Sequence, residues 1–391
     1  MTDLQGSAVR PESLWSRLRA FGGSSRIVGI DIARGLAVLG MFGAHIGVSE
    51  PFNWTPDTWL NLVNGRSSIL FAVLAGVSIV IISGGTHPVS GVALVQSRIR
   101  IFARAAMIFA LGGLLTSLGT QVAVILPAYA VLFVFALPFL RWSPRRLFAL
   151  AAVLAVLMPV LFTAILPFFE ALQPSAIVDL VVTGHYPAMI WLVFVLVGLG
   201  VGRLDLRVRR VQGWMLGAGA ALAVLGYGIG VAVTPATVAS VPVQTATSTL
   251  PAIDFSTLLT TEPHSGSPFE VIGSTGFVLA VLALCLLAVP LLRYVLYPVA
   301  AVGAMALTAY SVHIVAIAFY GDIVGTIFDN SMYLSYVLTA LVGCTLWTFL
   351  LGRGPFERIL TRVSHLAARI TPVATAGRLD GDPISKEITH P

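Results

Sequence analysis

Charged residues are scarce in this 391-residue chain, at 10% of the total, whereas soluble domains carry about a quarter. Hydrophobic residues make up 57%, and the mean hydropathy is +0.93. The two cysteines are isolated within apolar runs, which excludes a disulfide framework and a thiolate-rich metal centre. The composition therefore predicts a membrane protein with many spans.

The chain also lacks the motifs of several enzyme classes. It contains no Walker loop, dinucleotide-binding fingerprint, HExxH pair or nucleophile elbow, which disfavours ATP-driven, redox and hydride-transfer chemistry. Its net charge of +6 comes from arginines in short loops, not from one basic stripe interleaved with aromatic residues. We therefore expect neither a nucleic-acid partner nor a bound metal.

Long apolar runs, in contrast, are abundant. A helix needs about 20 apolar residues to cross a bilayer, and about ten runs qualify. They cover residues 28–48, 66–84, 101–118, 122–140, 147–168, 187–202, 212–233, 270–292, 298–320 and 332–352. No cleavage site follows the first run, which we interpret as a retained signal anchor. The pattern predicts an all-α, polytopic helix bundle in a cell membrane.

The 23 lysines and arginines are sorted to one side of this membrane. When the loops alternate between the two faces, all of them except Arg66 fall in segments on the same side. An excess of basic residues marks the cytoplasmic side, and an even number of spans leaves both termini there. Most carboxylates and histidines outside the basic segments lie at the opposite face. We therefore expect a polar site at the outer end of the bundle.

The predicted membrane domain covers residues 26–355. Residues 1–25 form a cytoplasmic segment with an interfacial helix, and residues 356–391 form a cytoplasmic amphipathic helix followed by a disordered tail. The external loop at about 234–269 is rich in Ser, Thr and Pro and is a candidate lid.

One stripe of the first span carries polar residues at helical spacing, among them Asp31, Arg34 and His45. Charges within a membrane are costly and usually functional. Arg34 lies near the inner boundary, and His45 lies about 16 Å further out. Alternatively, Asp31 and Arg34 form a snorkelling ion pair that orients the helix, and His45 is an ordinary buried histidine.

The ninth span repeats this arrangement, with Tyr310 and His313 on one face and His313 at a depth comparable to that of His45. For Tyr310 or His313 alone, a hydrogen bond between helices is the simpler interpretation. Two histidines at matching depth favour a common site. His185 also lies on the external side, where we expect it to be solvated.

The long loop adds His264, with Glu262 and Glu270 nearby, although solvation at the surface explains His264 equally well. Arg66 opens the second span at the acidic outer face. It is either a salt-bridge anchor for the first external loop or a clamp for a substrate oxyanion. The outer residues thus predict histidine-centred acid–base chemistry, and the inner arginines predict a site for an anionic donor.

Four stretches resemble a known family. Residues 26–37 (RIVGIDIARGLA) and 64–76 (NGRSSILFAVLAG), together with 264–270 (HSGSPFE) and 306–313 (ALTAYSVH), are similar to the bacterial branch of the heparan-alpha-glucosaminide N-acetyltransferase-like membrane proteins. The likeness covers about residues 26–355. It implies an enzyme that takes an acetyl or other acyl group from cytoplasmic acyl-coenzyme A and delivers it to an acceptor, usually a sugar, on the far side.

On this resemblance, the inner polar residues bind the donor and the outer ones serve the acceptor and the chemistry. The expected donor-binding residues are Asp31 and Arg34. The expected catalytic residues are His45, His313 and His264. The expected acceptor-binding residues are Arg66, Glu262, Glu270 and Tyr310. The chain departs from the lysosomal enzyme of the family, which is associated with a functional histidine beyond its first helix, because residues 46–63 contain no histidine.

A second class of function uses the same residues. In a secondary transporter or flippase for an anionic or glycan substrate, the histidines would relay protons, although the sequence shows no obvious internal repeat. A scaffold role is a third interpretation. For the acyltransferase, the expected partners are the bilayer, the acyl donor and a sugar or glycolipid acceptor, and a homodimer is compatible with the sequence.

Overall fold

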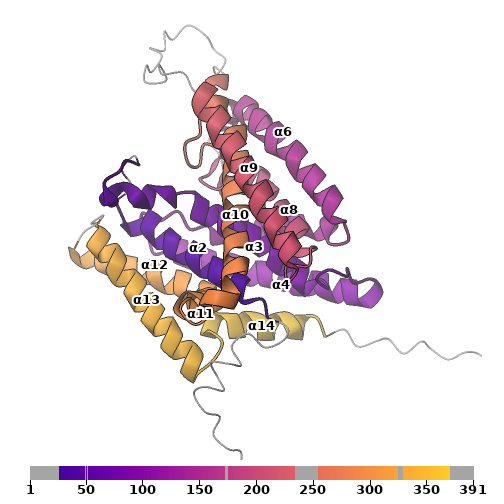
Figure 1. The fold of residues 1–391 in the computed structure, drawn as a ribbon, viewed down its shortest axis with the longest axis vertical. Helices are drawn as coiled ribbons and strands as arrows, with labels where there is room; N and C mark the ends of the chain where they lie inside the picture. The colour runs from indigo at the N-terminus through magenta and orange to yellow at the C-terminus, as the bar shows by residue number, and fades with distance from the viewer. Residues whose placement is uncertain are drawn as a thin grey trace, which may run out of the picture.

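The computed structural model describes residues 26–48, 50, 52–171, 175–233, 254–324 and 329–369. Within these ranges every regular element is a helix, as Figure 1 shows, so the all-α prediction is confirmed. The predicted N-terminal interfacial helix, the greater part of the predicted lid and the predicted C-terminal tail lie outside the described residues.

In the described part of the chain, seven helices are long and apolar enough to cross a membrane. They belong to α2 (Val28–Ile46), α3 (Arg66–Ile82), α4 (Gly91–Thr116), α6 (Pro144–Ala171), α9 (Arg209–Val233), α10 (Pro268–Leu292) and α13 (Asn330–Leu350). A 3-10 helix, η1 (Pro56–Leu62), precedes α3, and η4 (Phe255–Leu259) precedes α10.

Two bent pairs and one short helix complete the set. The short segments α7 (Ala176–Val178) and η3 (Asp179–Thr183) meet α8 (Ala188–Gly202) at 55°, and α11 (Tyr297–Ala304) meets α12 (Ala306–Val324) at 83°. The apolar helix α5 (Leu126–Ala136), extended by η2 (Leu137–Phe139), lies between α4 and α6 in the chain. Each predicted run corresponds to one of these segments, which confirms the polytopic bundle.

Local sequence explains where α10 begins. Ser267 is its N-cap, and the Ser267 hydroxyl accepts a hydrogen bond from the main-chain N–H of Glu270 at 3.0 Å. Pro268 occupies the first helical position, where its missing N–H removes no hydrogen bond. The order Ser-Pro-Phe-Glu is therefore a helix-start signal, and it fixes the position of the loop just before it.

Helix α2 lies at the centre of the bundle. It contacts α3, α10, α11, α12 and α13, and 78% of its apolar stretch is buried, against 6% for α13. Figure 1 shows α13 and α6 at opposite edges, with α2, α3 and α10 between them. The outer helices thus present apolar side chains to the lipid, whereas α2 is surrounded by protein.

Glycine allows α2 and α11 to touch through their backbones. A Cβ on Gly303 would lie 1.8 Å from a main-chain oxygen of α2, and one on Gly35 would lie 2.0 Å from a main-chain oxygen of α11. Gly76 and Gly198 allow the same close approach between α3 and α8. Small residues at such crossings permit the close van der Waals packing that holds membrane helices together.

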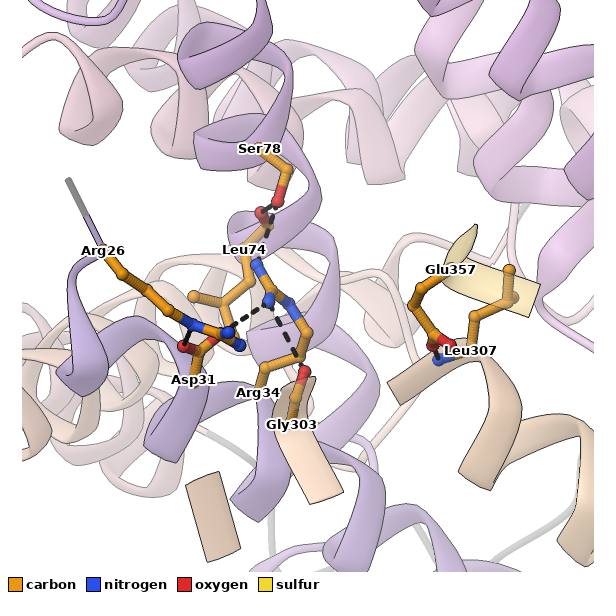
Figure 2. Close-up of polar contacts among 8 residues, drawn as sticks. All are labelled: Arg26, Asp31, Arg34, Leu74, Ser78, Gly303, Leu307 and Glu357. Carbon is orange, nitrogen blue, oxygen red and sulfur yellow. Dashed lines mark hydrogen bonds and ion pairs between the residues drawn. The ribbon is translucent and has the colours of Figure 1, made fainter. Parts of the chain in front are cut away.

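The C-terminal amphipathic helix exists as α14 (Pro355–Ala367) and packs against α4 and α12. Its Glu357 carboxylate accepts hydrogen bonds from the main-chain N–H groups of Leu307 and Thr308, at 2.8 and 3.0 Å. The Leu307 contact is visible in Figure 2. Glu357 therefore caps the first turn of α12, whose N–H groups have no partner within the helix. That α14 lies in the cytoplasmic interface of the membrane stays a prediction.

We expect Gly303→Ala to lower the thermal stability of the detergent-solubilised protein, because the new methyl group must push α11 away from α2. Overpacking of this kind costs about 1–3 kcal/mol. Gly343→Ala in α13 is the matched control, since a Cβ there meets nothing within 4 Å. Equal melting temperatures for the two variants would contradict the close contact.

Candidate functional site

His45, in the last turn of α2, and His313, in α12, are in direct contact. Nδ1 of His45 lies 2.9 Å from Nε2 of His313, which is hydrogen-bond distance, and the two rings are nearly parallel, at 8°. Such a bond between neutral imidazoles needs one proton between the two nitrogens, which either ring can supply. The fold therefore joins the two histidines that the sequence placed at matching depth.

His313 is held firmly by its surroundings. It is 3% exposed, and its ring lies 4.5 Å from that of Phe42 and 5.1 Å from that of Tyr310, between ring centres. The Tyr310 hydroxyl accepts a hydrogen bond from the main-chain N–H of Ile125 at 3.2 Å, which ties α12 to the start of α5. Tyr310 thus supports the histidine pair and makes no contribution to the cavity wall described next.

A cavity of about 500 Å³ opens beside His45 at this end of the bundle. Its walls come from α2, from the start of α3, from the connection between α4 and α5, from the segment before α8 and from α12. The polar residues in the wall, apart from His45 and His264, include Asn64, Ser67, Ser68, Thr120, Gln121 and His185. His185 therefore lines the cavity, and its side chain is exposed, as expected of a solvated residue.

His264 lies in the same wall in an unusual conformation. Its φ angle is 64°, and no other non-glycine residue among those described has a positive φ. The Glu270 carboxylate holds this loop by accepting the main-chain N–H groups of His264 and Gly266, at 3.2 and 2.9 Å. Burial, and to a lesser extent His185, lower the pKa of His264 to about 3, so this imidazole is neutral at physiological pH.

Glu270 and Glu262 differ in their burial and in their position relative to the cavity. Glu270 is buried and acts on the His264 loop, as just described, whereas Glu262 is exposed and does not line the cavity. Direct contact between Glu262 and a substrate in the cavity is not supported by this geometry.

Arg66 points away from the cavity. Its Nε donates to the Tyr227 hydroxyl at 2.7 Å, another nitrogen donates to the main-chain oxygen of Leu62 at 2.9 Å, and the guanidinium lies 4.7 Å from the centre of the Tyr227 ring. Tyr227 in turn bonds to Ser274 at 2.7 Å. Arg66 therefore anchors α3 to α9 and α10, through a tyrosine and not through the expected salt bridge.

Asp31 and Arg34 form a compact network at the other end of α2, as Figure 2 shows. Asp31 is 5% exposed and accepts hydrogen bonds from Arg26 at 2.5 Å and from Arg34 at 3.1 Å. Arg34 also donates to Ser78 of α3 at 3.1 Å and to the main-chain oxygen of Gly303 in α11 at 3.4 Å. These contacts occupy the guanidinium and favour a structural role for the pair.

A second group of cations, which the sequence did not single out, lies between α4 and the start of α14. The Nε atoms of Arg100 and Arg104 are buried and have no hydrogen-bond partner among the described groups. Arg104 is close enough to Arg100 and Arg353 to be repelled by both. No carboxylate in the described part of the chain forms an ion pair with these three arginines. The cluster is therefore suited to an anion.

Residues 26–231 match a family model that is described as heparan-alpha-glucosaminide N-acetyltransferase, catalytic. The chain belongs to this family. No curated protein matches the chain. As a member of the heparan-alpha-glucosaminide N-acetyltransferase family, it is a multi-pass membrane acetyltransferase. The matched region contains His45, whereas His264 and His313 lie beyond it. The histidine pair thus joins a matched helix to an unmatched one.

Removing the carboxylate of Asp31 tests the inner network. In Asp31→Asn, the partly buried Arg34 loses its counter-charge, and we expect the free energy of unfolding to fall by about 3 kcal/mol. This value is at the low end for buried pairs, because 22% of the Arg34 side chain remains exposed. The measurement is the melting temperature in detergent. Asp205→Asn, at an exposed carboxylate, is the control. If it lowers the melting temperature as much as Asp31→Asn does, the structural role of the Asp31–Arg34 pair is wrong.

The lowered pKa of His264 predicts a pH dependence of stability. In the unfolded state His264 has the ordinary histidine pKa of 6.5, whereas in the folded state its pKa is about 3. As the pH falls from 6.5 towards 3, the unfolded state therefore binds a proton that the folded state does not bind, and the free energy of unfolding falls. One such group contributes up to about 1.4 kcal/mol per pH unit. Between pH 7.5 and 5.5 the melting temperature should fall less in His264→Asn than in the parent protein. Asparagine suits the positive φ. The exposed His87, replaced by Asn, should leave the slope unchanged.

Proposed function

We propose that the protein transfers an acetyl or other acyl group from cytoplasmic acyl-coenzyme A to a sugar or envelope glycolipid on the opposite side of a cell membrane. The observation that carries this proposal is the hydrogen-bonded His45–His313 pair at the wall of a polar cavity. General-base catalysis by histidine is effective near neutral pH, and the outer cavity offers room for a hydrophilic acceptor.

His45 is the proposed base. With the shared proton on Nδ1 of His45, that atom donates to Nε2 of His313, and Nε2 of His45 keeps its lone pair for the acceptor. His313, which does not line the cavity, is then a positioning residue that accepts this hydrogen bond and orients the His45 ring. The rings of Phe42 and Tyr310 pack against His313 at 36° and 68° and restrict the movement of its ring.

In the proposed step, an acceptor hydroxyl or amine attacks the thioester carbonyl while Nε2 of His45 removes its proton. The carbon–sulfur bond then breaks, and the thiolate leaves and takes up that proton to give coenzyme A and the acylated acceptor. A direct attack needs no covalent enzyme intermediate. Transfer through an acylated histidine is the other route that the pair permits.

Two further residues in the wall are candidates for holding the acceptor. Thr120 Oγ1 and His264 Nδ1 are buried without a hydrogen-bond partner in the described part of the chain. Buried polar atoms are normally satisfied, so a bound hydroxyl group at either position would remove an energetic cost. Neutral His264 can donate or accept such a bond.

We assign the donor phosphates to Arg100, Arg104 and Arg353. Arginine forms strong, often bidentate hydrogen bonds to phosphate, and this cluster has no carboxylate paired with it in the described residues. From Arg104 to Thr116, the last residue of α4, the helix rises about 18 Å at about 1.5 Å per residue, and Leu118 of the cavity wall follows two residues later. The long pantetheine arm of the donor suits this separation. Asp31 and Arg34, which we expected to bind the donor directly, instead fix the helices around its route.

The test follows labelled acyl transfer from acetyl-coenzyme A to an envelope extract by purified protein. We expect His45→Ala to lower the rate by about 10²- to 10⁴-fold, the usual contribution of a general base. His313→Ala should also abolish most transfer. The exposed His87 gives the control variant, His87→Ala, which should retain full activity.

Undiminished transfer in both variants would overturn the site assignment. Proton-coupled substrate movement in liposomes without any acyl donor would instead favour the transporter interpretation. A strict requirement for acyl-coenzyme A would count against it.

A further inference from the structure

A second cavity, of about 310 Å³, lies at the opposite end of α2 from the histidines. The starts of α2, α9 and α11 and the end of α10 enclose it. Its polar wall consists of Arg26, Arg207, Arg209, Gln212, Arg293, Tyr294 and Tyr297. Among the residues that the structure describes, no aspartate or glutamate lines this cavity. Because Arg26 is already paired with Asp31, the cations that the described wall offers to a ligand are Arg207, Arg209 and Arg293.

We propose that this cavity binds the headgroup phosphate of an anionic phospholipid. Arg207, Arg209 and Arg293 form no ion pair with any carboxylate of the described residues. Arg293 donates one hydrogen bond to the Tyr294 hydroxyl and lies 4.5 Å from the centre of that ring, and its remaining N–H groups, with those of Arg207 and Arg209, can bind phosphate oxygens. Basic cavities between membrane helices on the cytoplasmic side suit such headgroups. The sorting of basic residues predicts that this end of the bundle faces the cytoplasm.

The surroundings of Arg293 place the cavity at the edge of the bilayer. Leu291 is 85% exposed and Val295 is 72% exposed, so apolar side chains flank the arginine on both sides. The floor of the cavity is also apolar, with Leu286 and Val289 in it. An amphipathic ligand satisfies both features, because its phosphate meets the arginines while its glycerol and acyl chains follow the apolar surface.

Packing separates this cavity from the histidine site and argues against the acyl donor as its ligand. A Cβ on Gly29 of α2 would lie 2.8 Å from Leu286 of α10, and the α2–α11 contact at Gly35 and Gly303 is closer still. At these positions the backbones of α2, α10 and α11 leave no room between them for a pantetheine arm. A phosphate held here belongs to a ligand whose remaining part points into the membrane.

The experiment measures the melting temperature of the purified full-length protein in detergent after addition of phosphatidylglycerol or of phosphatidylcholine with the same acyl chains. A ligand of the folded state raises the melting temperature. We expect phosphatidylglycerol to raise it more. The triple variant R207Q/R209Q/R293Q should bind phosphatidylglycerol about tenfold more weakly or worse, as expected from the loss of charged hydrogen bonds.

The variant R141Q/R145Q/R146Q is the matched control, because it removes three exposed arginines from another loop that we predict to lie on the same side. It should keep the full response to phosphatidylglycerol. If the first triple variant fails to fold, the single variant Arg293→Gln should still show a reduced response.

Equal stabilisation by the two lipids would overturn the proposal, as would an equal loss of response in the control variant. A third arm adds acetyl-coenzyme A. If the R207Q/R209Q/R293Q substitutions abolish stabilisation by acetyl-coenzyme A and leave that by phosphatidylglycerol intact, the cavity is a donor site and the lipid assignment is wrong. The proposal stands independently of the acyltransferase assignment, since it makes no use of the histidines.

Discussion

The arrangement of the bundle depends on a single carboxylate that is shared between two guanidinium groups. Asp31 is buried in the central helix, and its charge is tolerable there only because Arg26 and Arg34 surround it. Through Arg34 the same network reaches α3 and the main-chain oxygen of Gly303 in α11. These contacts fix the axial position of α2, and hence the height at which His45 meets α12.

The sequence predicted those parts of the site that depend on depth and periodicity. His45 and His313 lie at comparable depths in their apolar runs, which favours a common site, and hydropathy alone predicts the spans. Features that depend on a distant partner were not predictable. Arg66 turns away from the cavity because Tyr227, far along the chain, offers its hydroxyl and ring. His185 lies in the cavity wall because of the bend before α8, which has no periodic signal.

The two ends of the molecule differ in the charge of their polar side chains. Neutral, hydrogen-bonding side chains surround the outer cavity, whereas the inner end carries arginines in two separate places, one beside α14 and one at the start of α9. The α2–α11 contact lies between the arginines at the start of α9 and the histidine pair. The family match covers α2 and therefore one member of the histidine pair, while α12 supplies the other from outside the matched region.

The bend between α11 and α12 leaves the main-chain N–H groups in the first turn of α12 without partners in the helix. The Glu357 carboxylate of α14, about fifty residues further along the chain, accepts hydrogen bonds from two of them. His313 follows Leu307 by about 9 Å along the same helix. The position of α14 is thus linked, through the first turn of α12, to the helix that carries His313. Displacement of α14 would leave the first N–H groups of α12 without these acceptors, so α14 completes the helix that carries one member of the histidine pair.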